Sequence, residues 1–226
     1  KPWLMASADQ YRPAAPPALA TEAWARDYNE VKAIGARAST ARTAEQTEIA
    51  KFWEYSLPPI YYGVVRSVAD DPGRDTVRNA RLFAAVAQAM DDAMISVFDA
   101  KYHYNFWRPV TAIRNGDLDG NDGTEREATW GPLIETPLHP EYPSAHSILA
   151  AAVGAVLAAE IPAGARPALT TASPTAGGKL RRWASVDDLV REVADARIYA
   201  GIHFRTSTDV GATMGRRVGE LAVLAL

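Results

Sequence analysis

Cysteine is absent from the 226-residue sequence. The chain can therefore form no disulfide, no thiolate metal site and no cysteine nucleophile. Long apolar runs are also missing, since no stretch approaches the roughly 18 residues that a membrane-spanning helix requires. We expect a soluble chain with no membrane role, which argues against an integral-membrane lipid phosphatase.

A strong excess of charge is missing as well. The formal net charge is −3, which gives no general attraction to nucleic acid or to an anionic membrane. Any anion site must then be built from a few clustered cations. Apolar residues make up 48% and charged residues 23%, the usage of an ordinary globular protein. We expect residues 1–226 to form a single helical catalytic domain.

Helical periodicity is the main pattern along the chain, and alternating strand patterns are scarce. Residues 76–100 contain no glycine or proline and place apolar side chains at helical spacing. Polar caps and apolar spacing predict further helices over 21–35, 43–57, 144–160, 186–200 and 208–226. The predicted fold class is all-α, a compact bundle of roughly seven to nine helices.

Two segments are predicted to lack helices. Residues 1–20 carry four prolines, which predicts an extended amino-terminal arm on the surface. Residues 115–142 form a long connection rich in glycine, aspartate and proline, and loops of this length are often functional. Part of that loop has the alternation of a calcium loop, but Arg126 stands where the bidentate glutamate is needed, which favours a polar turn.

Three short segments combine cations, histidines and a helix start. Lys101 and Arg108 lie seven residues apart, which on one helix would place both on nearly the same face. Taken alone, the pair could be two surface cations.

The glycines Gly211, Gly215 and Gly219 in the last predicted helix indicate close helix packing.

The second segment is Pro143-Ser144-Ala145-His146, directly before an apolar helical run. Ser144 is placed as a helix cap, and the amides behind it could bind an oxyanion. His146 in the first turn could act as a general acid or base. The alternative is a plain cap beside a surface histidine.

The third segment runs from Arg197 to His203. Their six-residue offset would separate the side chains on an unbroken helix, so Gly201 is predicted to end or distort it. Alone, His203 could equally be a structural histidine.

In this order and spacing, Lys-x6-Arg-Pro, Pro-Ser-x-His and Arg-x5-His resemble the signature of the vanadium-dependent haloperoxidases and of the acid phosphatases related to type 2 phosphatidic acid phosphatases. The resemblance spans Lys101 to His203, and Trp107 is more similar to the haloperoxidase side. It implies a helical bundle of the haloperoxidase/acid phosphatase type, and it favours a secreted or periplasmic location.

The sequence departs from the family pattern at two positions. Ala145 replaces the usual glycine but keeps its backbone amide. Ser207 stands four residues after His203, where an aspartate is expected, and Asp209 follows two residues late. Whether Asp209 or another acid orients a histidine of the site is left open.

The resemblance also implies roles. His203 would coordinate vanadium, and His146 would handle the protons of peroxide. Vanadate, whose place phosphate can take, would be bound by the cations and donors of the three segments, namely Lys101, Arg108, Ser144, Ala145, Arg197 and His203. The reactants would be hydrogen peroxide, a halide and a small organic substrate, with no haem or thiol. A homo-oligomer is possible.

The haloperoxidase reading favours bromide or iodide, because His139 stands where bromoperoxidases have histidine. Trp107, His139 and Asp209 are the candidates for a halide-binding or supporting role. An acid phosphatase is the alternative, in which His203 would attack phosphorus and His146 would protonate the leaving alcohol. A second alternative is a non-catalytic phosphate-binding helical domain, which needs neither histidine.

Overall fold

The computed structural model describes residues 1–55, 57–162, 164–165 and 168–225. The helical prediction is confirmed. The α-helices are α1 (Glu22–Ile34), α2 (Ala44–Phe52), α3 (Leu57–Ala69), α4 (Thr76–Tyr104), α5 (Pro109–Arg114), α6 (Ala145–Glu160), α7 (Val186–Tyr199) and α8 (Arg205–Leu224). Short 3-10 helices, Gly116–Leu118 and Pro174–Ala176, lie in the connections.

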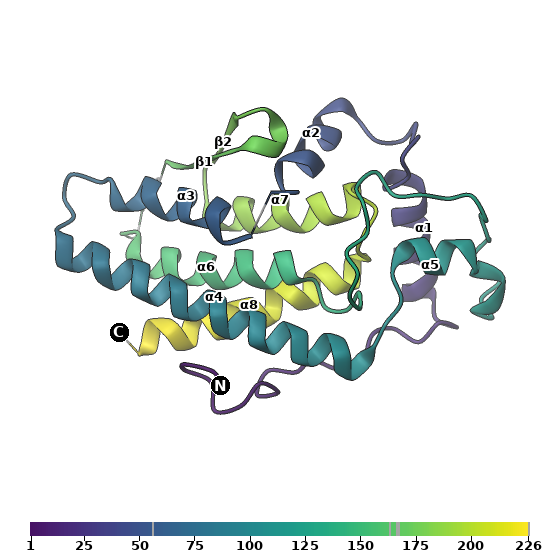
Figure 1. Ribbon diagram of the computed structural model, residues 1–226, viewed down its shortest axis with the longest axis horizontal. Helices are drawn as coiled ribbons and strands as arrows, with labels where there is room; N and C mark the ends of the chain where they lie inside the picture. Colours follow the sequence, from purple (N-terminus) through teal and green to yellow (C-terminus); the bar gives the residue numbers. More distant parts are fainter. Residues whose placement is uncertain (56, 163, 166–167, 226) are drawn as a thin grey trace.

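The long helices run along the length of the molecule, with α6 packed against α4, α7 and α8 (Figure 1). Helices α1 and α5 lie at one end. At that same end α4 and α7 finish, while α6 and α8 begin. Residues from four separate parts of the sequence therefore meet there.

Polar caps fix several helix starts as predicted. The Thr21 side chain accepts a hydrogen bond from the Trp24 amide at the start of α1. Thr43 and Gln46 form the complete capping box of α2. Ser144 caps α6 by accepting from the Ser147 amide. Each cap satisfies an amide that has no acceptor within its helix.

The predicted helix over 43–57 is too long. Helix α2 ends at Phe52, and a separate helix, α3, begins at Leu57. Pro58 and Pro59 lie in the first turn of α3, where a missing amide proton costs no hydrogen bond. The last helix begins at Arg205 rather than at 208, and residue 226 lies outside the described residues.

The sequence analysis did not predict strands. β1 (Leu169–Ser173) and β2 (Lys179–Trp183) form an antiparallel hairpin with Leu169 opposite Trp183. Lys179 and Arg181 reach from β2 to Glu48 and Glu45 on α2. Each strand is only five residues long, too short for alternation to stand out in the sequence.

The amino-terminal arm forms no helix or strand, as predicted, but it does not lie wholly on the surface. The amides of Trp3, Leu4 and Met5 donate to the buried carboxylate of Asp92 on α4, over 2.7, 2.8 and 3.0 Å. The Met5 side chain is buried in the main core. The arm therefore compensates a charge that α4 could not bury alone.

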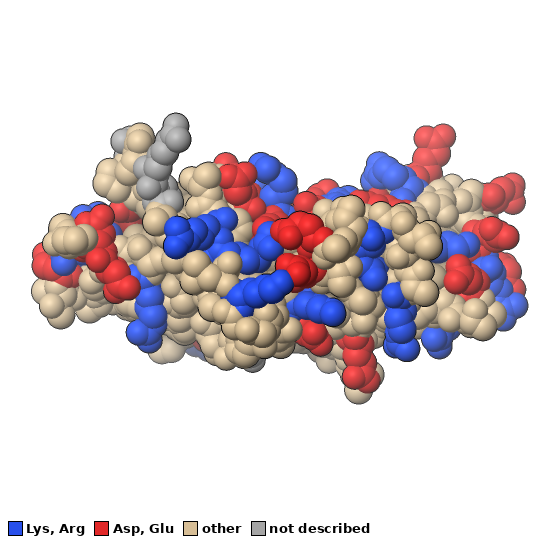
Figure 2. Space-filling model, turned by 90° about the horizontal axis from the view of Figure 1, so that it is seen from above, with Lys and Arg blue, Asp and Glu red and all other residues tan. Residues whose placement is uncertain are grey.

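Basic and acidic side chains are interspersed over the face seen in Figure 2, with no large patch of one sign. That face therefore offers no broad surface that would bind an anion by charge alone. Among the described helices, none is long and apolar enough to cross a membrane.

Three glycines of α8 bring its backbone against α6, in agreement with the close helix packing that they predict. A Cβ atom at Gly211 would lie 2.7 Å from the Ser144 carbonyl oxygen. At Gly215 it would lie 2.1 Å from the Ile148 oxygen, and at Gly219 2.5 Å from the Ala152 oxygen. Real Cβ atoms do not approach backbone so closely, so these positions require glycine.

We predict that Gly215→Ala lowers the free energy of unfolding by about 2–4 kcal/mol, because the added methyl group must push α8 away from α6. Chemical denaturation measures the loss. Gly131→Ala is the matched control, since its nearest neighbouring atom would be 4.0 Å away. Equal stability of the two variants would contradict the packing described here.

Candidate active site

Lys101 is completely buried in the last turn of α4. Its Nζ donates to the carbonyl oxygens of Pro140 and Glu141 over 2.9 and 2.8 Å. The partial negative charge at the end of a helix also favours a cation there. The long loop therefore supplies the acceptors that make burial of this ammonium possible.

Lys101 and Arg108 do not share a helix, so the argument from a seven-residue helical spacing is wrong. Helix α4 ends at Tyr104, and Asn105 adopts a left-handed conformation with φ 47°. Arg108 is the N-cap residue of α5. Asparagine tolerates this conformation, which ends the helix and changes the direction of the chain. Arg108 then lies close enough to Lys101 for the two charges to interact.

Arg108 is the most highly connected cation of the site. Its Nε donates to the His139 carbonyl over 2.9 Å, and its Nη1 donates to the Ile202 carbonyl over 2.8 Å. Nη1 also lies 3.2 Å from His203 Nε2, and Nη2 lies 3.1 Å from His139 Nδ1. One guanidinium thus links the long loop to the segment between α7 and α8.

Arg197 is buried in the last turn of α7. Its Nη1 donates to the Trp53 carbonyl over 2.8 Å, and its buried Nε has no hydrogen-bond partner among the described residues. Gly201, with φ 78°, follows the end of α7 as predicted. The chain turns there, and His203 comes to lie beside Arg108.

His203 is held by a carboxylate that the sequence analysis missed. Its Nδ1 lies 2.7 Å from Glu141 Oε1, which also accepts a hydrogen bond from the Phe204 amide over 3.0 Å. Since a carboxylate accepts, Nδ1 carries the proton and Nε2 presents a lone pair. That lone pair faces Arg108 Nη1.

The structure resolves the question of the missing aspartate. Ser207 Oγ lies 3.4 Å from His203 Nδ1, but the carboxylate there belongs to Glu141. Asp209 is exposed and lines a different hollow with Arg205 and Asp195. In the sequence, the only sign of this role is that Glu141 is acidic and stands three positions before Ser144.

Ser144, Ala145 and His146 lie at the start of α6, where the first amides have no acceptor within the helix. Ser144 is buried, and its Oγ accepts from the Ser147 amide and hydroxyl. Its own hydroxyl proton remains available for donation. The buried Nε2 of His146 has no hydrogen-bond partner among the described residues.

The electrostatics of the two histidines show that the cations converge. Burial lowers the pKa of His203 well below its usual value, and Arg108, Lys101 and Arg197 lower it further. Burial and the same three cations lower the pKa of His146. Both imidazoles are therefore neutral near pH 7, with nitrogen lone pairs among buried positive charges.

The cations themselves are also perturbed. Burial lowers the pKa of Arg108 and of Arg197 to about 10, so both guanidinium groups stay protonated at neutral pH. Burial, with Arg108, lowers the pKa of Lys101. Burial raises the pKa of Glu141, although Lys101 and Arg108 oppose that rise. Positive charge with few acid partners is suited to an oxyanion.

Trp107 and His139 border this cluster. Trp107 stacks on Trp24 at 5.8 Å between ring centroids, and its buried Nε1 has no partner among the described residues. His139 contacts Arg108 through Nδ1 and the edge of Phe98 through its ring. Of the three predicted supporting residues, Asp209 is the one placed apart.

Comparison with known proteins agrees with this geometry. The model of the VCPO second helical-bundle domain matches residues 81–226, more than half of the chain. The chain belongs to the vanadium haloperoxidase family. It is 33% identical over 138 residues to the vanadium chloroperoxidase of Curvularia inaequalis, a match that covers 51% of this chain and 22% of that protein.

Solved structures of haloperoxidases share the fold. The first bacterial vanadium-dependent iodoperoxidase superposes with a TM-score of 0.82 at 28% identity, covering 100% of this chain and 55% of that one. A holo-type bacterial vanadium-dependent chloroperoxidase superposes with a TM-score of 0.77 at 20% identity, covering 98% of this chain and 52% of that one. The chain thus spans about half the length of these solved haloperoxidases and 22% of the Curvularia protein.

Glu141 is predicted to stabilise the protein by joining the end of the long loop over 115–142 to the segment that carries His203. Glu141→Ala leaves His203 Nδ1 and the Phe204 amide without an acceptor, which should lower the free energy of unfolding by about 2–4 kcal/mol. Glu141→Gln keeps an acceptor oxygen and should lose less. Urea denaturation of both variants tests this, and equal losses would contradict the assigned hydrogen bonds.

A second prediction concerns pH. Burial, with Lys101 and Arg108, lowers the pKa of His139 from 6.5 to about 4. Between these values the unfolded chain binds a proton that the folded chain does not, so His139 makes folding less favourable as pH falls. Because His139 is partly exposed, the effect is reduced. Between pH 7 and 4, the free energy of unfolding of the wild-type protein should fall by roughly 1–2 kcal/mol more than that of His139→Gln. Parallel stability curves for the two proteins would refute this.

Proposed function

We propose that this chain carries the catalytic site of a vanadium-dependent haloperoxidase, which oxidises iodide or bromide with hydrogen peroxide. The observation that carries the proposal is the pair formed by His203 and Glu141. It presents a neutral, buried Nε2 lone pair 3.2 Å from Arg108 Nη1. A fixed nitrogen ligand beside buried cations fits an oxyanion that also accepts one coordinate bond.

The donors around His203 fit vanadate. Lys101, Arg108 and Arg197 would offset the charge on its oxygens, and the Ser144 hydroxyl and Ala145 amide would donate to them. The unpaired Arg197 Nε is a buried donor available for such a ligand. Vanadate bound at His203 would supply the oxidising chemistry, by activating hydrogen peroxide toward the halide. Phosphate, with the same shape and charge, could compete for the site.

His146 is suited to move protons in this reaction. Its buried Nε2 has no hydrogen-bond partner among the described residues. Burial and the nearby cations lower its pKa, and an anion bound beside those cations would offset their effect, so that Nε2 could accept a proton from peroxide. It can then return that proton as the oxygen–oxygen bond breaks and water leaves. The overall balance is hydrogen peroxide, halide and one proton giving hypohalous acid and water.

The choice of iodide or bromide rests on two observations. His139, the residue that resembles the bromoperoxidase pattern, contacts Arg108 and so lies at the edge of the cation cluster. The first bacterial vanadium-dependent iodoperoxidase also covers this chain fully, at 28% identity. Both support a halide that is easier to oxidise than chloride.

We expect the purified chain to oxidise iodide or bromide in the presence of hydrogen peroxide, measured with a halogen-accepting dye, after addition of orthovanadate. His203→Ala should lose at least about 100-fold in activity and should bind vanadate much more weakly, because the coordinating nitrogen is removed. Titration followed by ⁵¹V NMR measures that affinity directly.

His103→Ala is the matched control, since His103 is exposed at the end of α4. It should keep wild-type activity and vanadate affinity. Hydrolysis of phosphate esters that vanadate inhibits, without halide oxidation, would instead support the phosphatase. Unchanged anion affinity in His203→Ala would favour a non-catalytic phosphate-binding domain.

A further inference from the structure

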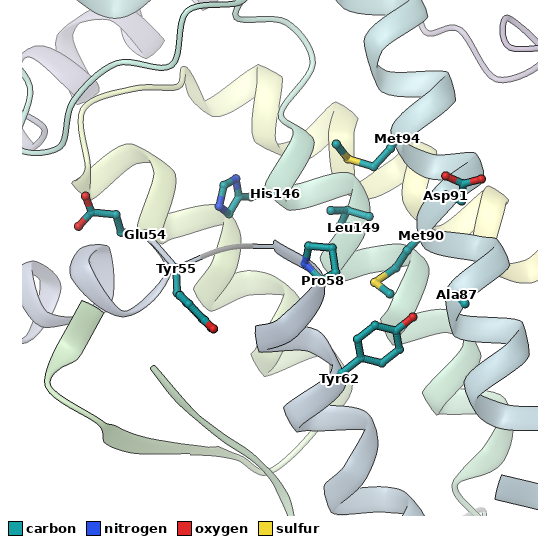
Figure 3. Close-up of a pocket in the computed structure, with 10 residues that line it drawn as sticks. All are labelled: Glu54, Tyr55, Pro58, Tyr62, Ala87, Met90, Asp91, Met94, His146 and Leu149. Atoms are coloured by element: carbon teal, nitrogen blue, oxygen red, sulfur yellow. The ribbon is translucent and has the colours of Figure 1, made fainter. Parts of the chain in front are cut away.

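The amino-terminal arm runs beside α4 toward the end of the molecule where α4 finishes (Figure 1). Its first amides donate to Asp92, and Trp3 Nε1 donates to the neighbouring Asp91 over 2.7 Å. Asp91, on α4, and His146, on α6, both line a cavity of about 480 Å³ (Figure 3). The arm is thus attached to the helix whose last turn carries Lys101.

Two neighbouring carbonyl groups of the arm accept hydrogen bonds from tyrosines of two different segments. The Tyr104 hydroxyl, at the end of α4, donates to the Pro13 carbonyl oxygen. The Tyr142 hydroxyl, at the end of the long loop, donates to the Ala14 carbonyl oxygen over 2.8 Å. The two tyrosine rings contact edge to face, with their centroids 5.5 Å apart. The arm therefore joins the end of α4 to the end of the loop.

Further contacts hold this part of the arm from two sides. Arg12 forms a partly buried bidentate pair with the Asp99 carboxylate on α4, Nε to Oδ2 over 2.9 Å and Nη2 to Oδ1 over 3.0 Å. The guanidinium group of Arg217 on α8 lies over the Tyr11 ring, 4.5 Å from its centroid. Residues 11–14 therefore contact α4, α8 and the long loop at once.

Each of these tyrosines stands next to a group of the proposed anion site. Tyr104 lies three residues after Lys101, whose Nζ donates to the Glu141 carbonyl oxygen over 2.8 Å. Tyr142 follows Glu141 directly, and the Glu141 carboxylate lies 2.7 Å from His203 Nδ1. Since one helical turn or a single peptide bond separates the neighbours, a displaced tyrosine would displace the binding group. Anion sites depend on such groups being held in place by their surroundings.

We propose that residues 11–14 of the arm position the groups that bind the anion. Tyr104 acts through Lys101 on the same helix, and Tyr142 acts through Glu141, its neighbour in the chain. Both tyrosines are positioning residues and do not touch the anion. This inference rests on the proposed function, because it concerns an oxyanion bound at that site. Loss of one hydrogen bond to the arm should loosen the site while every binding group is still present.

Tyr142→Phe tests this assignment, because it keeps the ring and removes only the donor to the arm. Tyr28→Phe is the matched control, since its buried hydroxyl also donates to a backbone carbonyl oxygen of the long loop over 2.8 Å. Both variants should shift the urea midpoint by similar amounts. In Tyr142→Phe alone, the Phe204 amide, which donates to Glu141, should exchange with solvent at least about fivefold faster than in the wild type.

Anion affinity is the second measurement, with orthovanadate followed by ⁵¹V NMR and inorganic phosphate followed by ³¹P NMR. Tyr142→Phe should raise the dissociation constant for both anions about threefold to tenfold, whereas Tyr28→Phe should leave both unchanged. If Tyr142→Phe matches the control in exchange and in affinity, the proposal is wrong. Faster exchange with unchanged affinity would also overturn it, because the arm would then stabilise the loop without positioning the anion.

A double variant tests whether the arm segment acts as one unit. Arg12→Met removes a different contact of the same segment. In Arg12→Met/Tyr142→Phe, the dissociation constant for orthovanadate should rise by less than the product of the two single fold-changes, because both contacts hold one segment. A rise equal to that product would mean independent contacts and would reject the assignment. If the wild-type chain binds neither anion, the proposed function fails, and exchange of the Phe204 amide alone decides whether the arm positions Glu141.

Discussion

Three cations, Lys101, Arg108 and Arg197, are buried in this fold and must find compensating partners within it. Lys101 and Arg108 draw their acceptors from backbone carbonyls of the long loop and of Ile202, and Arg197 draws one from Trp53. Charges withdrawn from water are tolerated only with such partners. The loop over 115–142 is therefore part of the site, because its final residues hold the cations in place.

The sequence predicted those parts of the fold that depend on local rules. Caps such as Ser144 and the periodicity of 76–100 locate α6 and α4, because both signals act within one or two helical turns. The motif resemblance found the cations and histidines. The prediction that Lys101 and Arg108 share one helical face was wrong, because it assumed that the helix continued through Asn105.

Other features could not be predicted, because they depend on distant partners. Glu141 becomes important only when the turn between α7 and α8 brings His203 within 2.7 Å, 62 residues further along the chain. The split between α2 and α3 and the short hairpin have weak local signals. The cavity beside His146 combines residues from three segments, so no single stretch of sequence indicates it.

The glycines on α8 also determine how well the region beside the proposed site tolerates substitutions. Gly211 lies against the Ser144 carbonyl, and the Ser144 amide donates to the Ser207 carbonyl, so the two helices meet in backbone contact beside the anion site. Gly219 makes the same type of contact about two turns further away. Sensitivity to substitution should therefore be graded. A shift of α8 near Gly211 would displace the groups that we propose to bind the anion, whereas a shift at Gly219 would be absorbed along the helix. The position of the proposed anion site would thus depend on how closely the backbones of α6 and α8 approach each other.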